Sequence, residues 1–158
     1  GEICVKVGPD FMAPYLEEAA GSLIGVIVRD HQPHQPAPHL LIQNCCITLG
    51  RLGMVCGQQM GKAFPSFAKQ WCTVMKTVRL DIEKVNAFQG LCNLVKANPQ
   101  ACLTCMPELA GAIASFYPAP PNLDPEFRQI LHSYKQTLGA TWPSIYATMP
   151  DEVKMRLA

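Results

Sequence analysis

Apolar residues recur in steps of three and four along most of this 158-residue chain. This period is typical of amphipathic helices, and no stretch alternates apolar and polar residues for long enough to predict a strand. The sequence therefore predicts an all-α fold. The expected helices span residues 12–29, 39–57, 64–79, 82–98, 100–117 and 125–139, with shorter helices at 1–7, 141–149 and 151–158.

The expected helices form pairs that repeat at a nearly constant spacing. Pro65 and Pro107, each at the start of a helix, are 42 residues apart, as are Leu49 and Leu91 in the alternate helices. Proline is tolerated in the first helical turn because its missing N–H would have no partner there. Two-helix units of about 40 to 47 residues are the period of HEAT and armadillo repeats, which bury one another's faces in a superhelix. We therefore expect a HEAT-repeat α-solenoid.

The spacing also predicts where each repeat lies. The expected repeats span residues 11–57, 64–98 and 100–139, followed by a shortened C-terminal capping repeat at 141–158. Residues 1–7 are expected to end a preceding repeat, so the chain is expected to be a segment of a longer superhelix. The expected core faces consist of Leu16, Ala20, Leu23, Ile27, Leu41, Cys45, Leu49, Leu52, Cys56, Phe64, Phe67, Trp71, Val74, Val78, Phe88, Leu91, Cys92, Val95, Cys102, Cys105, Leu109, Ile113, Phe116, Phe127, Leu131, Tyr134 and Leu138.

The composition narrows the class of protein. With 49% hydrophobic and 16% charged residues the chain belongs to the folded class, and its formal charge of +1 creates no field that would gather nucleic acid or anionic lipid. The longest clean apolar run, residues 23–28, is interrupted by Gly25, whereas about 18 to 20 residues are needed to span a bilayer. We expect a soluble protein of the cytoplasm or nucleus, without a nucleic-acid or membrane partner.

Eight cysteines and a cluster of histidines raise the question of chemistry. Cys102 and Cys105 form a C-x-x-C motif, but no second such motif completes a zinc site, and both fall on the apolar stripe of an expected helix. We interpret all eight thiols as reduced core residues, and His31, His34 and His39 as solvated side chains of a proline-rich loop. We expect no metal, cofactor or catalytic residue. A thiol enzyme using the C-x-x-C pair is a weak alternative.

The helix expected at 39–57 carries a second face opposite its core stripe. At 100° per residue, Leu40, Gln43, Ile47, Arg51 and Met54 lie almost diametrically across from that stripe. Two interpretations remain open at this point. The second face packs against neighbouring repeats, or Ile47, flanked by Gln43 and Arg51, forms part of a surface for an extended peptide.

Short motifs in a fixed order resemble one known family. The chain is similar over residues 1–158 to the C-terminal repeats of the transportins, which are nuclear import receptors of the karyopherin-β class. The motifs that carry the resemblance are Gly-Glu-Ile at 1–3, Ile-Thr-Leu-Gly-Arg-Leu-Gly at 47–53, Trp-Cys-Thr at 71–73, Gly-Leu-Cys at 90–92, Asn-Pro at 98–99, Ile-Leu-His at 130–132 and Arg-Leu-Ala at 156–158.

The resemblance implies a function without catalysis. Helices 39–57, 82–98 and 125–139 would form the inner layer, which receives proline-tyrosine nuclear localisation signals, and Ile47 would match an apolar position that contacts cargo. Ran-GTP, bound mainly by an N-terminal arch outside this chain, would release the cargo, and the receptor would shuttle through the nuclear pore in contact with nucleoporins. The implied cargo-binding residues are Gln43, Ile47, Arg51, Met54, Asn86 and Gln89. A HEAT-repeat scaffold subunit of a multiprotein complex is the alternative.

Overall fold

The computed structural model describes residues 1–29 and 38–157, which are almost entirely helical. No strand occurs within those two ranges, and the all-α HEAT-repeat solenoid expected from the sequence is confirmed. The α-helices are α1 (Glu2–Val7), α2 (Pro9–Met12), α3 (Leu16–Arg29), α4 (His39–Met60), α5 (Ala68–Met75), α6 (Ile82–Ala97), α7 (Met106–Ala114), α8 (Asp124–Leu138), α9 (Trp142–Thr148) and α10 (Asp151–Leu157).

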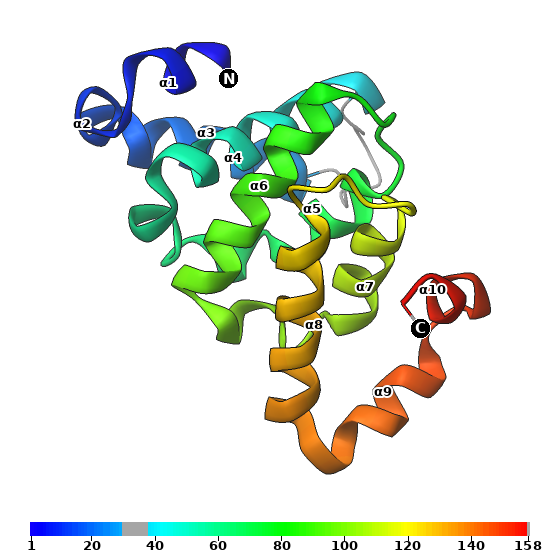
Figure 1. The fold of residues 1–158 in the computed structure, drawn as a ribbon. Coiled ribbons are helices and arrows are strands. Elements are labelled where there is room, and N and C mark those ends of the chain that lie inside the picture. Colours follow the sequence, from blue (N-terminus) through cyan, green and yellow to red (C-terminus); the bar gives the residue numbers. More distant parts are fainter. Residues whose placement is uncertain (30–37, 158) are drawn as a thin grey trace.

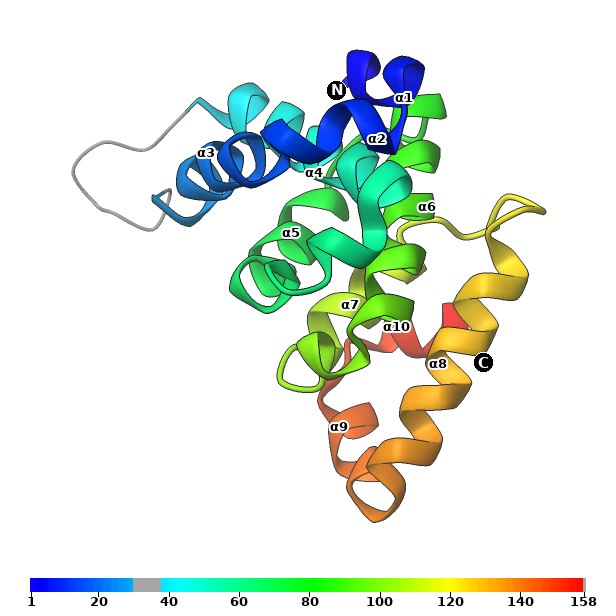
Figure 2. The same ribbon diagram turned by 90° about the vertical axis from the view of Figure 1, so that its left-hand side faces the viewer.

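The helices stack in sequence order in two layers. Figure 2 shows the stack running from α1 and α2 at the top to α9 at the bottom. Helices α3, α5, α7 and α9 contact one another in turn along one layer, and α4, α6 and α8 do so along the other. We call the second set the inner layer, following the resemblance. Helix α10 departs from this order because it packs against α7 (Figure 1).

The first layer begins its helices with tight 3-10 turns. Pro14, Pro65 and Pro99 lie in the 3-10 segments Ala13–Tyr15, Phe64–Ser66 and Pro99–Cys102, which precede α3, α5 and α7. Proline cannot donate to the carbonyl four residues before it, so each of these turns starts a new segment rather than continuing the helix that precedes it. The continuous helices expected at 12–29, 64–79 and 100–117 are each divided into a 3-10 turn and an α-helix.

The two C-x-x-C cysteines lie at one of these divisions rather than along a helix stripe. Cys102 ends a 3-10 segment, and Cys105 is the N-cap residue of α7. Both are nevertheless buried in the core, as expected, and all eight cysteines of the chain are buried and free.

The expected core residues are buried or half-buried with one exception. Leu41 is 46% exposed, in the first turn of α4, so its assignment to the core was wrong. The centre of the core is aromatic, with Phe88 in contact with Trp71, Phe116 and Phe127 at ring-centroid distances of 5.2, 4.5 and 5.9 Å. The Trp71 indole N–H also donates to the Cys46 carbonyl at 2.7 Å, which ties α5 to α4.

Two helical stretches are long and apolar enough to cross a membrane by length and composition. They are Pro9–Val28, of 20 residues, and His39–Met60, of 22 residues. Neither stretch is an uninterrupted apolar run, since polar residues are scattered through both. Half of the second stretch is buried inside the fold, as in the core helix of a folded domain.

Candidate binding surface

The inner helices α4 and α6 run side by side with their backbones in contact. Gly50 and Gly53 of α4 face Ala87 and Gly90 of α6, and a Cβ built on Gly90 would lie 1.7 Å from the Gly50 carbonyl oxygen. No side chain fits in that space, so glycine is required at this crossing. The sequence carries a signal for this contact that was not used in predicting the fold: glycines recur at positions 50, 53 and 57 of α4 and at its C-cap, Gly61.

Polar side chains then fix the register of the two helices. The Asn93 side-chain amide donates to the Met54 carbonyl at 3.2 Å, and the Asn98 amide donates to the Gly61 carbonyl at 2.9 Å. At the other end of the contact, Arg51 Nη2 donates to Glu83 Oε1 at 3.1 Å. These bonds hold the outward face of α6 in a constant position relative to α4.

Two of the residues expected on an open face lie below the surface. Ile47 is 6% exposed and belongs to the core cluster, while Arg51 is 9% exposed. Helix α1 packs against α4, and the residue before it, Gly1, lies against Arg51 and Thr48: a Cβ on Gly1 would approach Arg51 Nη1 to 2.9 Å and Thr48 Oγ1 to 3.0 Å. The open placement of Ile47 and Arg51 was therefore wrong for this chain, because a helical wheel of α4 contains no information about the elements that pack on it.

The remaining expected residues do reach the surface. Gln43 and Met54 on α4, and Asn86 and Gln89 on α6, are half-buried. Asn93, which the sequence analysis did not select, continues the stripe of Asn86 and Gln89 along α6 and is also half-buried. We refer to Gln43, Asn86, Gln89 and Asn93 as the amide surface.

Exposed apolar side chains lie at one end of the amide surface. Leu40 in the first turn of α4 is 72% exposed, and Ile82 at the start of α6 is 68% exposed. Amide side chains can donate and accept hydrogen bonds at once, as the main chain of an extended peptide requires. The combination of amides with exposed apolar residues suits a peptide better than a small charged molecule.

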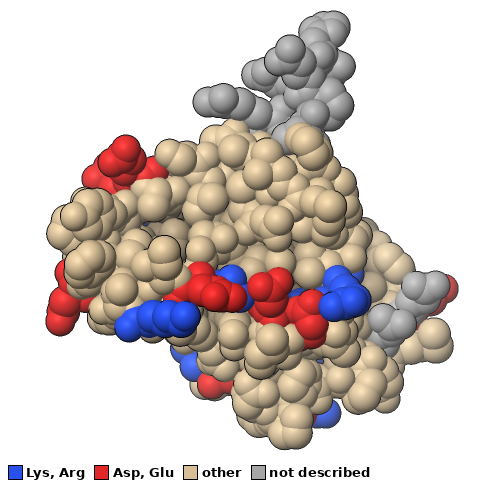
Figure 3. Space-filling view, turned by 90° about the horizontal axis from the view of Figure 1, so that it is seen from above, with Lys and Arg blue, Asp and Glu red and all other residues tan. Residues whose placement is uncertain are grey.

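Each acidic side chain of the inner helices is paired with a basic one. Glu83 is bound to Arg51 at 3.1 Å, Glu126 to Lys96 at 2.5 Å, and Asp124 to Arg128 at 2.7 Å. Figure 3 shows acidic and basic side chains next to one another in a row across one face of the molecule rather than a field of one sign. Selection of a ligand here would therefore depend on hydrogen bonds and shape more than on net charge.

One lysine is buried beside this layer. Lys84 is 2% exposed, and its ammonium group donates to the Val78 carbonyl at 2.9 Å and lies 5.0 Å from the centre of the Phe116 ring. Burial lowers the pKa of Lys84 to about 8, an effect that the nearby Asp81 carboxylate opposes. Lys84 joins the turn before α6 to the segment after α7, so its part is structural.

The described residues contain no cluster of three or more His, Cys, Asp or Glu that could hold a metal ion. His31 and His34 lie outside the described residues. Burial raises the pKa of the Cys46 and Cys92 thiols to about 12. The Cys102 thiol, by its hydrogen bond, lowers the pKa of Cys105, but Cys105 is only 1% exposed, so a substrate has no access to it.

Known proteins resemble this chain along its full length. None of the protein-family models matches it. Transportin-1 of Homo sapiens is 32% identical over 159 residues, which is 100% of this chain and 17% of that relative. Transportin of Dictyostelium discoideum is 27% identical over 154 residues, covering 98% of this chain and 16% of the relative. Importin subunit beta-2 of Schizosaccharomyces pombe is 28% identical over 144 residues, covering 90% and 15%.

The names of these relatives indicate the class of protein to which this HEAT-repeat chain is similar. The class defined by the fold and by the names of the relatives is that of the karyopherin-β nuclear import receptors, which are transport receptors rather than enzymes. Within that class the chain is a transportin-like member of the karyopherin-β family. It spans 17% of the length of the Transportin-1 sequences it matches.

Proposed function

We propose that this chain forms the C-terminal part of a transportin-like nuclear import receptor and contributes to the surface that binds nuclear localisation signals of the proline-tyrosine type. The observation that carries the proposal is that the whole chain is similar to a segment, 17% of the length, of Transportin-1, at 32% identity over 159 residues, together with the two-layer helical stack. The receptor would shuttle between cytoplasm and nucleus. Its partners would be cargo proteins, nucleoporins and Ran GTPase, with neither nucleic acid nor membrane involved.

The binding step needs no catalytic group. Gln43, Asn86, Gln89 and Met54 are half-buried, so they are held in place by the fold while part of each side chain can reach a ligand. Amides fixed in this way lose little conformational freedom when they bond to a peptide main chain. Ile47 and Arg51 would act in this chain by supporting the surface from below rather than by touching cargo.

A peptide titration tests this function. A fluorescein-labelled proline-tyrosine signal peptide, titrated with the chain and followed by fluorescence anisotropy, should bind saturably. Gln89→Ala and Asn86→Ala should each weaken binding by about fivefold or more, since a lost hydrogen bond is worth about 1 kcal/mol. The matched control is Gln58→Ala, an exposed glutamine on the last turns of α4, which should leave the affinity unchanged.

Some results of the same titration would contradict the proposed function. No saturable binding at about 100 μM chain, roughly −5 kcal/mol of binding free energy, would reject the proposed function for this segment. Ran-GTP should not displace the peptide from this chain, because the proposed Ran site lies outside it. A stable folded subunit that co-purifies in place of peptide binding would support the scaffold alternative.

A further inference from the structure

An apolar cleft lies near the C-terminal end of the stack, between the end of α7, the start of α8 and α10. It has a volume of about 430 Å³ and shares no residue with the amide surface. Its floor is formed by Ile113, Phe116 and Phe127, which are core residues with 5% exposure or less. A cleft of this size accepts one large side chain together with its flanking main chain.

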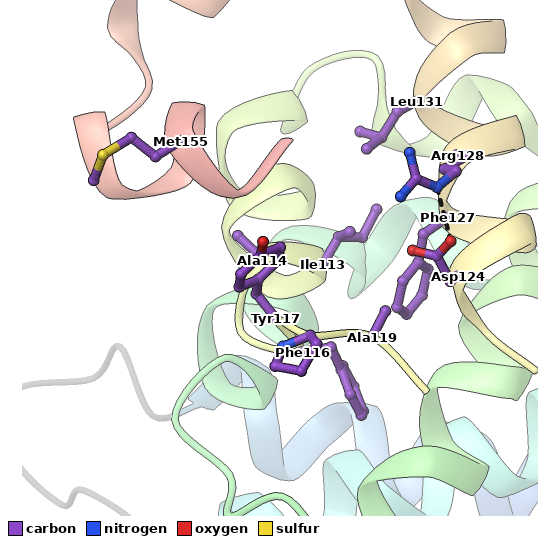
Figure 4. Close-up of a pocket in the computed structure, with 11 residues that line it drawn as sticks. Ile113, Ala114, Phe116, Tyr117, Ala119, Asp124, Phe127, Arg128, Leu131 and Met155 are labelled. Atoms are coloured by element: carbon purple, nitrogen blue, oxygen red, sulfur yellow. Dashed lines mark hydrogen bonds and ion pairs between the residues drawn. The ribbon is translucent and has the colours of Figure 1, made fainter. Parts of the chain in front are cut away.

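The rim of the cleft carries an exposed apolar side chain. Tyr117, after α7, is 67% exposed. Helix α10 lies on the same side because it packs against α7, but Figure 4 shows the side chain of its Met155 extending away from the other lining residues. A large apolar side chain that stands open beside a buried apolar floor is typical of a partner site.

An ion pair, Arg128 with Asp124, supplies the polar character of the rim. Arg128 Nε donates to Asp124 Oδ2 at 2.7 Å, and the Arg128 side chain is 78% exposed. Figure 4 shows its two terminal nitrogens turned toward the space between α7 and α8. The Asp124 bond engages Nε, so the forked end of the guanidinium can still meet a carboxylate with two hydrogen bonds.

We propose that this cleft binds a segment of a partner protein in which a large apolar side chain is followed directly by an acidic residue. The apolar side chain fills the cleft over Phe116 and Phe127, and the carboxylate bonds to the terminal nitrogens of Arg128. The carboxylate is selected by the two terminal nitrogens of Arg128, which the bond between Nε and Asp124 leaves free to donate. This partner segment differs in chemistry from a proline-tyrosine signal and binds at a site separate from the amide surface.

A methyl NMR titration tests the site directly. The chain is labelled with ¹³C in the methyl groups of Ile, Leu and Met, and is titrated with the acetylated and amidated peptide Gly-Ser-Phe-Asp-Ser-Gly. The methyl signals of Ile113 and Leu131 should shift saturably, while that of Ile82 stays in place. The peptide with Asn in place of Asp should bind about tenfold more weakly, because it loses the charge-assisted bonds to Arg128.

Variants separate the charge from the cleft. Arg128→Gln should reduce the preference for the Asp peptide over the Asn peptide to less than about twofold, whereas Arg79→Gln, another highly exposed arginine, should leave it unchanged. Ala119→Leu should narrow the cleft and weaken both peptides alike. Thermal melting of each variant verifies that it is folded.

Two results would overturn the proposal. The first is the absence of a saturable shift at Ile113 and Leu131 with millimolar peptide. The second is equal affinity for the Asp and Asn peptides, which would leave an apolar site without selection for charge. In addition, if the folded Arg128→Gln variant still preferred the Asp peptide over the Asn peptide, Arg128 would not be the residue that recognises the carboxylate.

Discussion

The contact between α4 and α6 differs from the contacts that α8 makes. Helices α4 and α6 meet at Gly50 and Gly90 with their backbones touching. Helix α8 has no glycine between Asp124 and Leu138, and clefts of about 360 and 430 Å³ lie beside it, toward α6 and toward α7 and α10. Glycine thus sets the distance between adjacent inner helices, and side chains that hold helices apart leave room for ligands.

The largest expected effect concerns Ile47, on the helix that makes the close α4–α6 contact. Ile47→Asp should lower the free energy of unfolding by about 3 to 5 kcal/mol, because it buries a carboxylate without a partner. Urea denaturation measures the loss. The control is Leu40→Asp, on the same helix but 72% exposed, which should change stability by about 0.5 kcal/mol or less. Equal losses in the two variants would contradict the burial of Ile47.

The glycine contact itself is the next test. Gly90→Ala should destabilise the chain by about 3 kcal/mol, since the added Cβ meets the Gly50 carbonyl and the helices must move apart. Gly111→Ala in α7 is the matched control, because its Cβ would find no atom nearer than 3.9 Å. That variant should be more stable by about 0.5 to 1 kcal/mol, as alanine favours helix over glycine. If Gly90→Ala were neutral in denaturation, the close crossing would be disproved.

Loss of an ion pair should have a smaller effect on stability, and the effect should differ between the α4–α6 contact and the α6–α8 contact. Glu83→Gln leaves the buried Arg51 without its charged partner and should cost about 1 to 2 kcal/mol. Glu126→Gln, between α8 and the half-exposed Lys96, should cost less than about 1 kcal/mol. Denaturation at low and high salt should show that only the second loss depends clearly on ionic strength. A reversed order would mean that α6 and α8 depend on charge more than α4 and α6 do.

The smallest effect at neutral pH concerns Lys84. Its pKa is about 8 in the folded chain and near 10.5 when unfolded, so above pH 8 the unfolded state binds more protons. The contribution of Lys84 to stability should therefore rise between pH 8 and 10.5 and stay constant below pH 8. The buried thiols act in the opposite direction above pH 9, because their folded pKa values are raised.

A difference measurement isolates this lysine. The unfolding free energy of the chain minus that of Lys84→Met, measured from pH 7 to 10.5, cancels the thiol contribution. The difference should become more favourable to the unmodified chain as the pH rises. A flat difference would show that Lys84 has an ordinary pKa and is solvated.

Much of the fold could be predicted from local sequence patterns. The stripe of Leu49, Leu52 and Cys56 has the helical period, and those residues are indeed buried. Proline positions predicted where helices of the first layer begin, although not that Pro14 and Pro65 would lie in separate 3-10 turns. The division into repeats stays a prediction, as does the cargo-binding role of Gln43, Asn86 and Gln89.

The sequence by itself determined the helical periods, the spacing of the helix pairs and the family resemblance, because each of these is recorded in neighbouring residues or in their order along the chain. The tertiary structure alone decided which side of α4 is covered. Ile47 and Gln43 share a face of the helix, but Ile47 is buried and Gln43 is half-exposed. That difference, like the cleft at Arg128, depends on where helices that are distant in sequence begin and end. The local helical period of α4 carries no information about those positions.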